Sequence, residues 1–522
     1  MTTPSTLLIG GVGQKQVLMN TRMANRHGMI AGATGTGKTV TMQILAEEFS
    51  KAGVPVLMAD VKGDVSGLAC AATPHPKIDE RNEAIGITDY QMQANPVVFW
   101  DLYGIKGHPV RATVSELGPL LISNLLDLNE TQTGVLYAAF KIADEHGMLL
   151  LDLEDLQSLL GWMSDNASEL RGDYGNFTSA SIGAIQRDLL VLEEQDAEVF
   201  LGEPVLELDD LMRQDFSGRG IINVLDVTTI ISRGPKLYAT FLLWLMSELF
   251  ENMPEVGDAD KPKFVMFFDE AHLLFDDAPK ALVDKIEQVV RLIRSKGIGV
   301  YFVSQSPLDI PEDVLGQLGM KIQHALRAFT PKEQKAVKVV AENFRANESI
   351  DTEKVITQLG VGEALVSVLD ENGVPTPVEQ ILIRPPQSRI GPASDEERAE
   401  QIKRSPIGRR YDEALNRQSA VEELKHRAEK QLQKAEEEAA RIAAEKQAAL
   451  DAKEAKKAEL AAEKERKRLE REAAREEKRR SGGSSQRQSA TEAMIKSMAR
   501  SAGTQIGGKV VRGLLGSLFG GR

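Results

Sequence analysis

Eight consecutive residues have the types and spacing of a phosphate-binding loop, G-x-x-x-x-G-K-T. They are Gly32, Ala33, Thr34, Gly35, Thr36, Gly37, Lys38 and Thr39. Glycines let successive backbone N–H groups turn inward onto an anion, and the N-terminus of a following helix adds partial positive charge. We expect Lys38 to reach the β- and γ-phosphates of ATP and the Thr39 hydroxyl to ligate Mg²⁺. Val40 completes the predicted nucleotide-binding segment, and a chance turn rich in glycine and threonine is the alternative.

Two adjacent carboxylates follow an apolar run in the second half of the chain. Residues 263–268 have the composition of a buried strand and end at Asp269 and Glu270. We expect Asp269 to hold Mg²⁺, directly or through water, and Glu270 to polarise an attacking water molecule. His272 is interpreted as a structural neighbour of this pair. The phosphate loop and the carboxylates together predict Mg²⁺-dependent hydrolysis of ATP.

A polar residue and two arginines flank a further apolar run, residues 299–304. Gln305 follows this run, where it could sense the γ-phosphate or orient water. Arg291 and Arg294 precede it, and an arginine at this place could reach the phosphates of a neighbouring subunit, as an arginine finger does. The alternative for Arg291 and Arg294 is a solvated or salt-bridged helix face.

The elements that must position these residues alternate between strands and helices. Apolar runs that are typical of buried strands occupy residues 28–31, 54–60, 220–226, 263–268 and 299–305. Residues 40–49 and 237–249 have the apolar spacing of helices. This alternation predicts an α/β fold with a mainly parallel sheet. Asp60 ends one of the strands, and the turn after it is either a second part of the site or a simple capped turn.

Smaller elements complete the first predicted domain, residues 1–393. Residues 6–9 and 16–19 are expected to pair as an edge hairpin beside the nucleotide site. Residues 362–369 and 376–383 are expected to form a closing hairpin across residues 370–373. Between them, residues from about 115 to 205 have a helical pattern and are interpreted as an inserted helical subdomain.

The C-terminal quarter of the chain has a different composition. Residues 394–480 are rich in Ala, Glu, Lys and Arg, with few apolar positions, which predicts a long charged helix or a weak coiled coil. Acid-to-base pairs at four-residue spacing support that helix: Glu423–Arg427, Glu437–Arg441, Glu463–Lys467 and Glu476–Arg480. Residues 481–522 are predicted to be a flexible linker and a cationic amphipathic tail that docks on a partner protein, a neighbouring subunit or an anionic membrane.

Composition restricts the class of protein further. A single cysteine, Cys70, excludes a disulfide framework or a zinc finger. No signal peptide and no apolar run of about 20 residues is found, so the sequence predicts a soluble cytoplasmic protein without a transmembrane segment. The net charge of −14 argues against diffuse binding of nucleic acid, although it allows a basic channel inside a ring.

The motifs resemble those of the HerA/FtsK superfamily of ring ATPases. The matching stretches are residues 32–39, 269–272, 291–299 and 304–307. Residues 126–132, 267–275 and 324–330 make the region from about 5 to 393 similar to the bacterial HerA-like YjgR family. The resemblance implies a RecA-like core, a hexamer with ATP sites at subunit boundaries, and a pore for double-stranded DNA. It also implies that Arg294 is the trans-acting finger and Gln305 the polar sensor.

Two departures from the superfamily are expected. HerA carries an N-terminal β-barrel, for which the segment before Gly32 has no room. FtsK motors carry membrane spans and a winged helix, and neither is expected in this sequence. Three functions stay open on this reasoning. The first is a DNA translocase or helicase, and the second is a protein-remodelling or regulatory ring ATPase that recruits clients through its C-terminal arm. A small-molecule phosphotransferase ranks last, because Glu270 next to Asp269 favours water as the acceptor.

Overall fold

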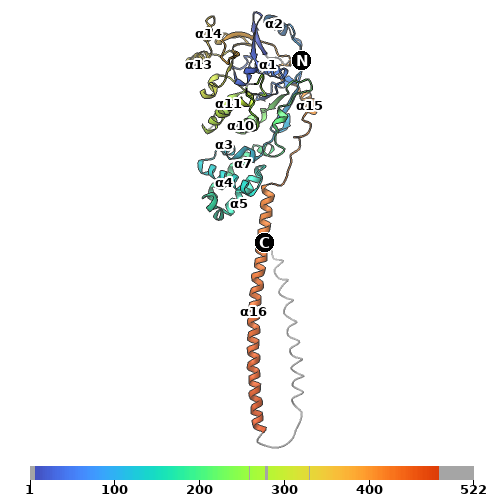
Figure 1. Cartoon of the computed structure of the whole chain (residues 1–522), viewed down its shortest axis with the longest axis vertical. Coiled ribbons are helices and arrows are strands. Elements are labelled where there is room, and N and C mark those ends of the chain that lie inside the picture. Colours follow the sequence, from blue (N-terminus) through green and yellow to red (C-terminus); the bar gives the residue numbers. More distant parts are fainter. Residues whose placement is uncertain (1–5, 258, 277–279, 329, 481–522) are drawn as a thin grey trace. The chain divides into compact units, whose positions relative to one another are not determined.

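The computed structural model describes residues 6–257, 259–276, 280–328 and 330–480, and Figure 1 shows their fold. The predicted linker and tail, residues 481–522, lie outside the described residues. The chain divides into two compact units, Met1–Ala428 and Glu429–Arg522. Among the described residues, no helix combines the length and the apolar character that crossing a membrane requires.

A single mixed sheet organises the first unit. Its twelve described strands lie in the order β2-β1-β12-β11-β10-β3-β9-β8-β4-β7-β5-β6. They are β1 (Thr6–Val12), β2 (Lys15–Asn20), β3 (Gly28–Ala31), β4 (Val56–Asp60), β5 (Val97–Asp101), β6 (His108–Pro109), β7 (Ile222–Asp226), β8 (Phe264–Phe268), β9 (Ile298–Ser304), β10 (Met320–Gln323), β11 (Glu363–Ser367) and β12 (Glu379–Ile383). All neighbours from β10 to β6 are parallel. The predicted α/β fold with a mainly parallel sheet is confirmed.

The central strands are apolar throughout because both faces of the sheet are covered. Along β8, Phe264, Met266 and Phe268 belong to one hydrophobic cluster, and Val265 and Phe267 belong to the other. Such alternation between two buried faces is the reason why strands of parallel sheets read as continuous hydrophobic runs. Helices α10 and α11 contribute to the first cluster, and α1 contributes to the second.

The helices of the first unit fill the connections between strands. Their bounds are α1 (Lys38–Lys51), α2 (Pro76–Ile85), α3 (Val114–Leu125), α4 (Glu130–His146), α5 (Leu153–Asp165), α6 (Ala167–Tyr174), α7 (Ser179–Glu193), α8 (Leu208–Leu211), α9 (Thr228–Arg233), α10 (Pro235–Asn252), α11 (Lys280–Ile293), α12 (Glu312–Leu315), α13 (Pro331–Glu342), α14 (Thr352–Gln358) and α15 (Asp395–Lys403). Helices α3 to α7 fall within the segment that the sequence predicted to be helical. Capping boxes at Thr113, Asn129 and Asp152 begin α3, α4 and α5.

The two predicted hairpins form at one side of the sheet. Strands β1 and β2 pair antiparallel, and so do β11 and β12. The first hairpin is at the edge of the sheet as expected, but β12, β11 and β10 separate it from β3. It therefore does not lie beside the strand that precedes the phosphate loop. The reason is that β12 returns to pair with β1 and inserts the closing hairpin between them.

The predicted helix over residues 394–480 is interrupted in the structure. Helix α15 ends at Lys403, and α16 (Ala420–Arg480) begins only after an irregular segment that contains Pro406. This segment packs on the first unit, where the Tyr411 hydroxyl donates to Asp210 Oδ2 over 2.6 Å. The compact unit therefore reaches Ala428, beyond the predicted boundary at residue 393.

Helix α16 has 61 residues, and nearly all of their side chains are exposed. Two of the predicted pairs are present, with Arg427 Nε 2.8 Å from Glu423 Oε1 and Lys467 Nζ 2.7 Å from Glu463 Oε1. Arg441 pairs with Glu438 at 2.9 Å instead of with the predicted Glu437. Leucines such as Leu432 and Leu450 are more than half exposed. The choice between a lone helix and a weak coiled coil stays a prediction.

Candidate nucleotide site

The phosphate loop connects the carboxyl end of β3 to the start of α1. Gly32 has φ +154°, and a Cβ there would come within 2.5 Å of the His324 side chain. Gly37, which begins α1, has φ +118°, a conformation that L side chains rarely adopt. Thr36 Oγ1 donates to the Ala33 carbonyl over 2.7 Å and closes the loop on itself. These two glycines are therefore required by close packing and by backbone conformation.

Lys38 lies buried against the loop that it follows. Its Nζ donates to the carbonyl oxygens of Gly32 over 2.5 Å and of Ala33 over 3.3 Å. Burial and then the charge of Lys62 lower the pKa of Lys38, while Glu270 and Asp269 act in the opposite direction. The fold thus brings the loop lysine within electrostatic range of both carboxylates.

The carboxylate pair follows β8, as the sequence predicted. Asp269 and Glu270 are both buried, and Glu270 has φ +47°, which is rare for a residue with a side chain. Burial raises the pKa of Asp269 to about 6, against the lowering effect of Lys62. Burial also acts to raise the pKa of Glu270, but the hydrogen bond and charge of Lys62 outweigh it and hold that pKa below its usual value. The two neighbours therefore differ in proton affinity.

The residues at this edge suit a magnesium ion that is shared with a nucleotide. Asp269 Oδ2 is buried and has no hydrogen-bond partner among the described residues. Thr39 lies in the first turn of α1, directly after Lys38. No cluster of three or more His, Cys, Asp or Glu side chains that could hold a metal occurs in the described part of the chain. Mg²⁺ is commonly held by one or two carboxylates together with substrate phosphates, and Asp269 and Thr39 fit that pattern.

Lys62 belongs to the site, although sequence reasoning did not single it out. Its Nζ lies 2.6 Å from Glu270 Oε1. The turn that carries it is held by Asp60, which accepts hydrogen bonds from the backbone N–H groups of Gly63 at 2.7 Å and Val65 at 3.2 Å. Asp60 therefore caps the turn, and Lys62 is the residue that reaches the carboxylates. Its position after a strand is only weak evidence for a functional site. The turn after β4 meets the carboxylates after β8 because these two strands pair in the sheet.

Gln305 lies just beyond the end of β9 and is exposed. Strand β9 pairs in parallel with β3 on one side and with β8 on the other. The residue therefore follows a strand that runs between the phosphate loop and the carboxylates. Ser304 Oγ donates to Asp309 Oδ2 over 2.5 Å and fixes the end of this strand. A role for Gln305 in sensing phosphate stays a prediction.

Arg291 and Arg294 lie at the opposite edge of the sheet from the phosphate loop. Arg291 lies in the last turn of α11, is exposed, and forms an ion pair with Glu287 one turn earlier. Arg294 begins a short 3-10 turn before β9. Both line a cavity of about 580 Å³, which we call the cationic cavity. Its other cations are Arg26, Lys321 and Arg345, and among the described residues that line it none carries a carboxylate.

A buried histidine ties the loop to the neighbouring strands. His324 follows β10, its Nε2 lies 2.8 Å from Thr41 Oγ1, and its Nδ1 lies 2.9 Å from the Glu363 carbonyl. Burial lowers the pKa of His324 to about 4, so the ring is neutral at pH 7. Nδ1 then donates to the carbonyl and Nε2 accepts from the threonine hydroxyl. Sequence reasoning missed this contact, because nothing in the local pattern connects residue 324 with α1.

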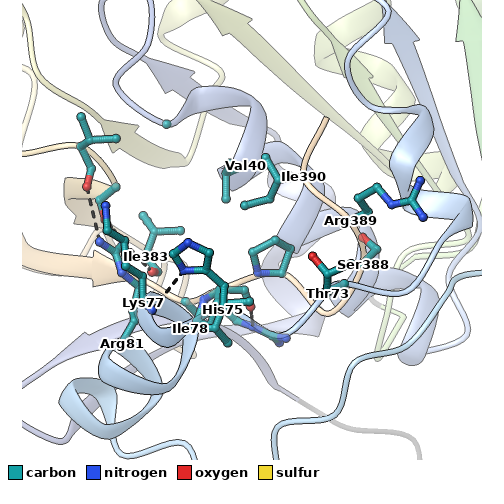
Figure 2. Close-up of a pocket in the computed structure, with 17 residues that line it drawn as sticks. Val40, Thr73, His75, Lys77, Ile78, Arg81, Ile383, Ser388, Arg389 and Ile390 are labelled. Carbon is teal, nitrogen blue, oxygen red and sulfur yellow. Dashed lines mark hydrogen bonds between the residues drawn. The ribbon is translucent and has the colours of Figure 1, made fainter. Parts of the chain in front are cut away.

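A second cavity, of about 440 Å³, opens beside the start of α1. We call it the loop cavity. Its walls come from Gly37 and Val40, from residues 72–81 around the start of α2, and from residues 383–390 after β12 (Figure 2). The phosphate loop, the carboxylate pair and the loop cavity therefore share one edge of the sheet. A phosphate loop after a central parallel strand, with an acidic pair after a nearby strand, defines a RecA-like P-loop nucleoside triphosphatase core.

The chain belongs to the helicase HerA-like C-terminal family, whose model matches residues 6–522. The predicted resemblance to the HerA/FtsK superfamily is thereby confirmed. A probable helicase from Methanocaldococcus jannaschii is 22% identical over 350 residues, which cover 66% of this chain and 60% of that protein. The DNA double-strand break repair helicase HerA of Sulfurisphaera tokodaii is 22% identical over 371 residues, which cover 69% and 65%. The matches thus span less than two thirds of the length of these relatives.

Two solved structures are also similar to the chain. The bacterial conjugative coupling protein TrwBdeltaN70 matches with a TM-score of 0.47 and 13% identity over 73% of this chain and 89% of that one. VirB4 of Thermoanaerobacter pseudethanolicus matches with a TM-score of 0.48 and 16% identity over 76% and 99%.

Proposed function

We propose that this protein is a Mg²⁺-dependent ATPase that forms a ring, a hexamer, and uses hydrolysis to move along or unwind double-stranded DNA. The observation that carries the proposal is the division of charged groups between the two edges of the sheet. The phosphate loop and the two carboxylates share one edge, and Arg294 lies at the other. A subunit arranged in this way keeps Arg294 away from its own phosphate loop, at an edge that could meet the phosphates of a neighbouring subunit.

Each residue of the loop edge has a part in hydrolysis. The loop N–H groups and the Lys38 ammonium bind the β- and γ-phosphates, exchanging the carbonyl contacts of Lys38 for phosphate oxygens. Thr39 and Asp269 hold Mg²⁺, which neutralises negative charge on the phosphates. Glu270 accepts a proton from water as the water oxygen attacks the γ-phosphorus, the bond to the β-phosphate oxygen breaks, and ADP leaves. Gln305 orients that water or contacts the γ-phosphate.

Lys62 stabilises the ionised form of Glu270 that this role requires. Its ion pair at 2.6 Å stabilises the ionised carboxylate, which is the form that can accept a proton. Without that cation, the raising effect of burial on the pKa of Glu270 would be less strongly opposed. Lys62 is thus a positioning residue that acts through Glu270.

Arg294 serves the nucleotide of the neighbouring subunit in the proposed ring. An arginine finger stabilises charge that develops on the transferred phosphoryl group. The cationic cavity that surrounds Arg294 supports such a meeting with phosphates, since its described lining brings five cations together without a carboxylate. Arg291 is paired with Glu287 and is therefore less suited to this role than Arg294.

DNA is the proposed substrate of the motor because of the family and its relatives. The family is described as helicase HerA-like, and the relative from Sulfurisphaera tokodaii is called a DNA double-strand break repair helicase. The alternative is a ring ATPase that remodels or regulates proteins and recruits clients through its C-terminal arm. Helix α16 supports this alternative, since it carries exposed leucines along a solvated helix.

The test is the steady-state rate of ATP hydrolysis with and without linear duplex DNA, at low and at physiological salt. Salt is varied because contacts to DNA phosphates weaken steeply as it rises. Stimulation that persists at physiological salt supports the DNA motor. A robust rate that DNA leaves unchanged favours the protein-remodelling alternative, and a rate that Glu270→Gln leaves unchanged contradicts the assignment of the base.

A further inference from the structure

We propose that the loop cavity receives the nucleoside half of the bound nucleotide and holds it by apolar packing without reading the edge of the base. The protein then uses ATP and GTP with little discrimination. This inference rests on the proposed function of the phosphate loop, and it adds the nucleotide class that the site accepts.

The loop cavity lies where a nucleoside must lie if its phosphates are bound on the loop. Gly37, the last glycine of the loop, lines the cavity, and so does Val40, two residues after Lys38 (Figure 2). When Lys38 holds the triphosphate, the attached sugar and base therefore lie along the first turn of α1. The volume of about 440 Å³ falls within the range of roughly 300–1,000 Å³ that is usual for small-molecule sites.

The walls of the loop cavity are largely apolar. The apolar side chains include Val40 from α1, Ile78 from α2, Val361 before β11, Ile383 at the end of β12, and Pro385, Pro386 and Ile390 from the segment after β12. Figure 2 shows Val40, Ile78, Ile383 and Ile390 among the side chains around this space. Apolar side chains of this kind pack against the sugar and the faces of a base, and every base has such a face.

Three carbonyl groups of the segment after β12 are already hydrogen-bonded within the protein. The Pro385 carbonyl accepts from Arg384 Nε at 3.3 Å, and the Pro386 carbonyl accepts from the Tyr90 hydroxyl at 2.6 Å. The Gln387 carbonyl accepts from the N–H groups of Ala72 and Gln93, each at 2.9 Å.

Helix α1 holds three further backbone groups of this segment. The N–H groups of Gln387 and Ser388 donate to the Glu47 carboxylate at 2.9 and 2.8 Å. The Arg389 carbonyl accepts from Gln43 Nε2 at 2.9 Å. Glu47 is fully buried, and the buried Arg384 forms an ion pair with Glu48 beside it. The wall is therefore rigidly attached to the helix that begins at the phosphate loop.

The polar side chains that line the loop cavity are likewise occupied or exposed. Ser388 Oγ donates to Glu47 Oε1 at 2.5 Å and accepts from Gln43 Nε2 at 2.7 Å. Arg81 donates to the carbonyls of Gly362 at 3.0 Å and Ile383 at 3.2 Å.

The guanidinium of Arg389 forms two hydrogen bonds with Glu397, at 2.6 and 2.9 Å. The other polar side chains of the described lining are exposed: Thr73, His75 and Lys77. A hydrogen bond to an exposed group gains little, because water competes for it.

Discrimination between bases requires buried groups that the wrong base leaves unpaired. Sites built in that way reject a near-isosteric substrate by about 10⁴–10⁵-fold, whereas apolar pockets discriminate by only about 10²-fold or less. The loop cavity is an apolar pocket. We therefore expect the dissociation constants of ADP and GDP to agree within about tenfold.

The first experiment measures binding of ADP and of GDP to the full chain by calorimetry in the presence of Mg²⁺. Binding is measured so that the result does not depend on hydrolysis. Agreement of the two constants within about tenfold supports the inference, and a preference of more than about 100-fold for either base overturns it. If both diphosphates bind but neither ATP nor GTP is hydrolysed, the proposed function fails while the inference on base recognition stands.

The second experiment tests where the nucleoside lies. Ile390→Ala removes an apolar side chain that is 62% exposed and lines the loop cavity. We expect it to weaken ADP and GDP equally, by about fivefold to tenfold, and to leave competition by inorganic pyrophosphate unchanged. Ile78→Ala should act in the same way from the opposite wall.

Ile105→Ala is the matched control, because Ile105 is 67% exposed and does not line the loop cavity. Thermal unfolding of each variant shows whether it is folded. Unchanged affinity for ADP and GDP in both folded cavity variants, or an equal loss in the Ile105 control, overturns the placement of the nucleoside.

Discussion

The two cavities at opposite edges of the sheet have walls of opposite character. The loop cavity, beside the phosphate loop, is mainly apolar. Its arginines Arg81, Arg384 and Arg389 are bound to carbonyls or carboxylates, and its lysine, Lys77, is exposed. The cationic cavity gathers five cations, and among the described residues that line it none is acidic. Of these, Lys321 Nζ donates to the Asn343 carbonyl at 2.9 Å, and Arg345 donates to the Pro375 carbonyl at 2.9 Å.

This difference suggests how one chain divides the recognition of a nucleotide. Its own edge offers an anion-binding loop, a place for the nucleoside, and a base for water. The opposite edge offers five cations in a cavity whose described lining holds no carboxylate, and such a group of cations suits the phosphates of a second nucleotide. The parallel central strands explain why the two groups of residues are separated. Residues before the strands lie at one edge of the sheet, and residues after them lie at the opposite edge.

The largest expected effect comes from breaking the loop edge with Lys38→Ala. The variant should lose ATP hydrolysis to the level of a sample without enzyme, because the loop loses the buried ammonium that meets the phosphates. Calorimetry with ADP and a phosphate-release assay measure the loss. Lys51→Ala, at the other end of the same helix, is the control and should hydrolyse ATP normally. Normal hydrolysis by Lys38→Ala would mean that the loop is not the nucleotide site.

Arg294→Ala tests the opposite edge and should be next in size. We expect hydrolysis to fall by about 10³-fold or more with nucleotide binding kept, since arginine fingers contribute about 10³–10⁵-fold to turnover. Mixing this variant with Lys38→Ala should restore part of the activity, because each subunit then supplies the group that the other lacks. No recovery on mixing, with each variant folded, would argue against action between subunits.

Arg291→Ala completes the test of that edge as a matched comparison. Its ion pair with Glu287 is exposed, and pairs of this kind contribute only about 0–1 kcal/mol. We therefore expect a change in hydrolysis of less than about fivefold. A loss as large as that of Arg294→Ala would assign a functional role to both arginines of the cationic cavity.

Glu270→Gln separates hydrolysis from binding within the loop edge. A glutamine keeps the size of the side chain but cannot accept the proton of water, so kcat should fall by about 10²–10⁴-fold while ADP affinity changes little. Single-turnover measurements with ATP distinguish slow hydrolysis from slow product release. Full turnover by this variant would require another base.

The smallest expected effect is a dependence of stability on pH that involves both edges. His324 beside the loop and His27 beside the cationic cavity are buried, and burial lowers the pKa of each to about 4. The unfolded chain binds these protons near pH 6.5 and the folded chain does not, so stability is full above pH 6.5 and is lost as pH falls towards 4. Each histidine should contribute up to about 3 kcal/mol to this loss.

Urea unfolding at pH 7 and pH 5 measures this dependence. The variants His324→Gln and His27→Gln should each reduce the difference in unfolding free energy between the two pH values, since glutamine does not titrate. An unchanged difference in both variants would show that other groups cause the acid sensitivity.

The local chemistry of the site can be predicted from the sequence. The glycine spacing of residues 32–37 requires a tight loop, and the acidic pair at 269–270 follows a run of five apolar residues that forms β8. Loops and strands of this kind depend on neighbours in the chain, so spacing and periodicity are sufficient to predict them. The parallel sheet and the two hairpins followed from the same patterns.

The contacts between distant residues depend on the order of the strands in the sheet. Lys62 reaches Glu270 because β4 pairs with β8, and His324 reaches Thr41 because β10 pairs with β3. The cationic cavity likewise joins segments far apart in the chain, from Arg26 to Arg345. Strand order is set by the burial of whole faces of the sheet and not by local spacing, which is why the sequence could name single residues of the site but not these contacts.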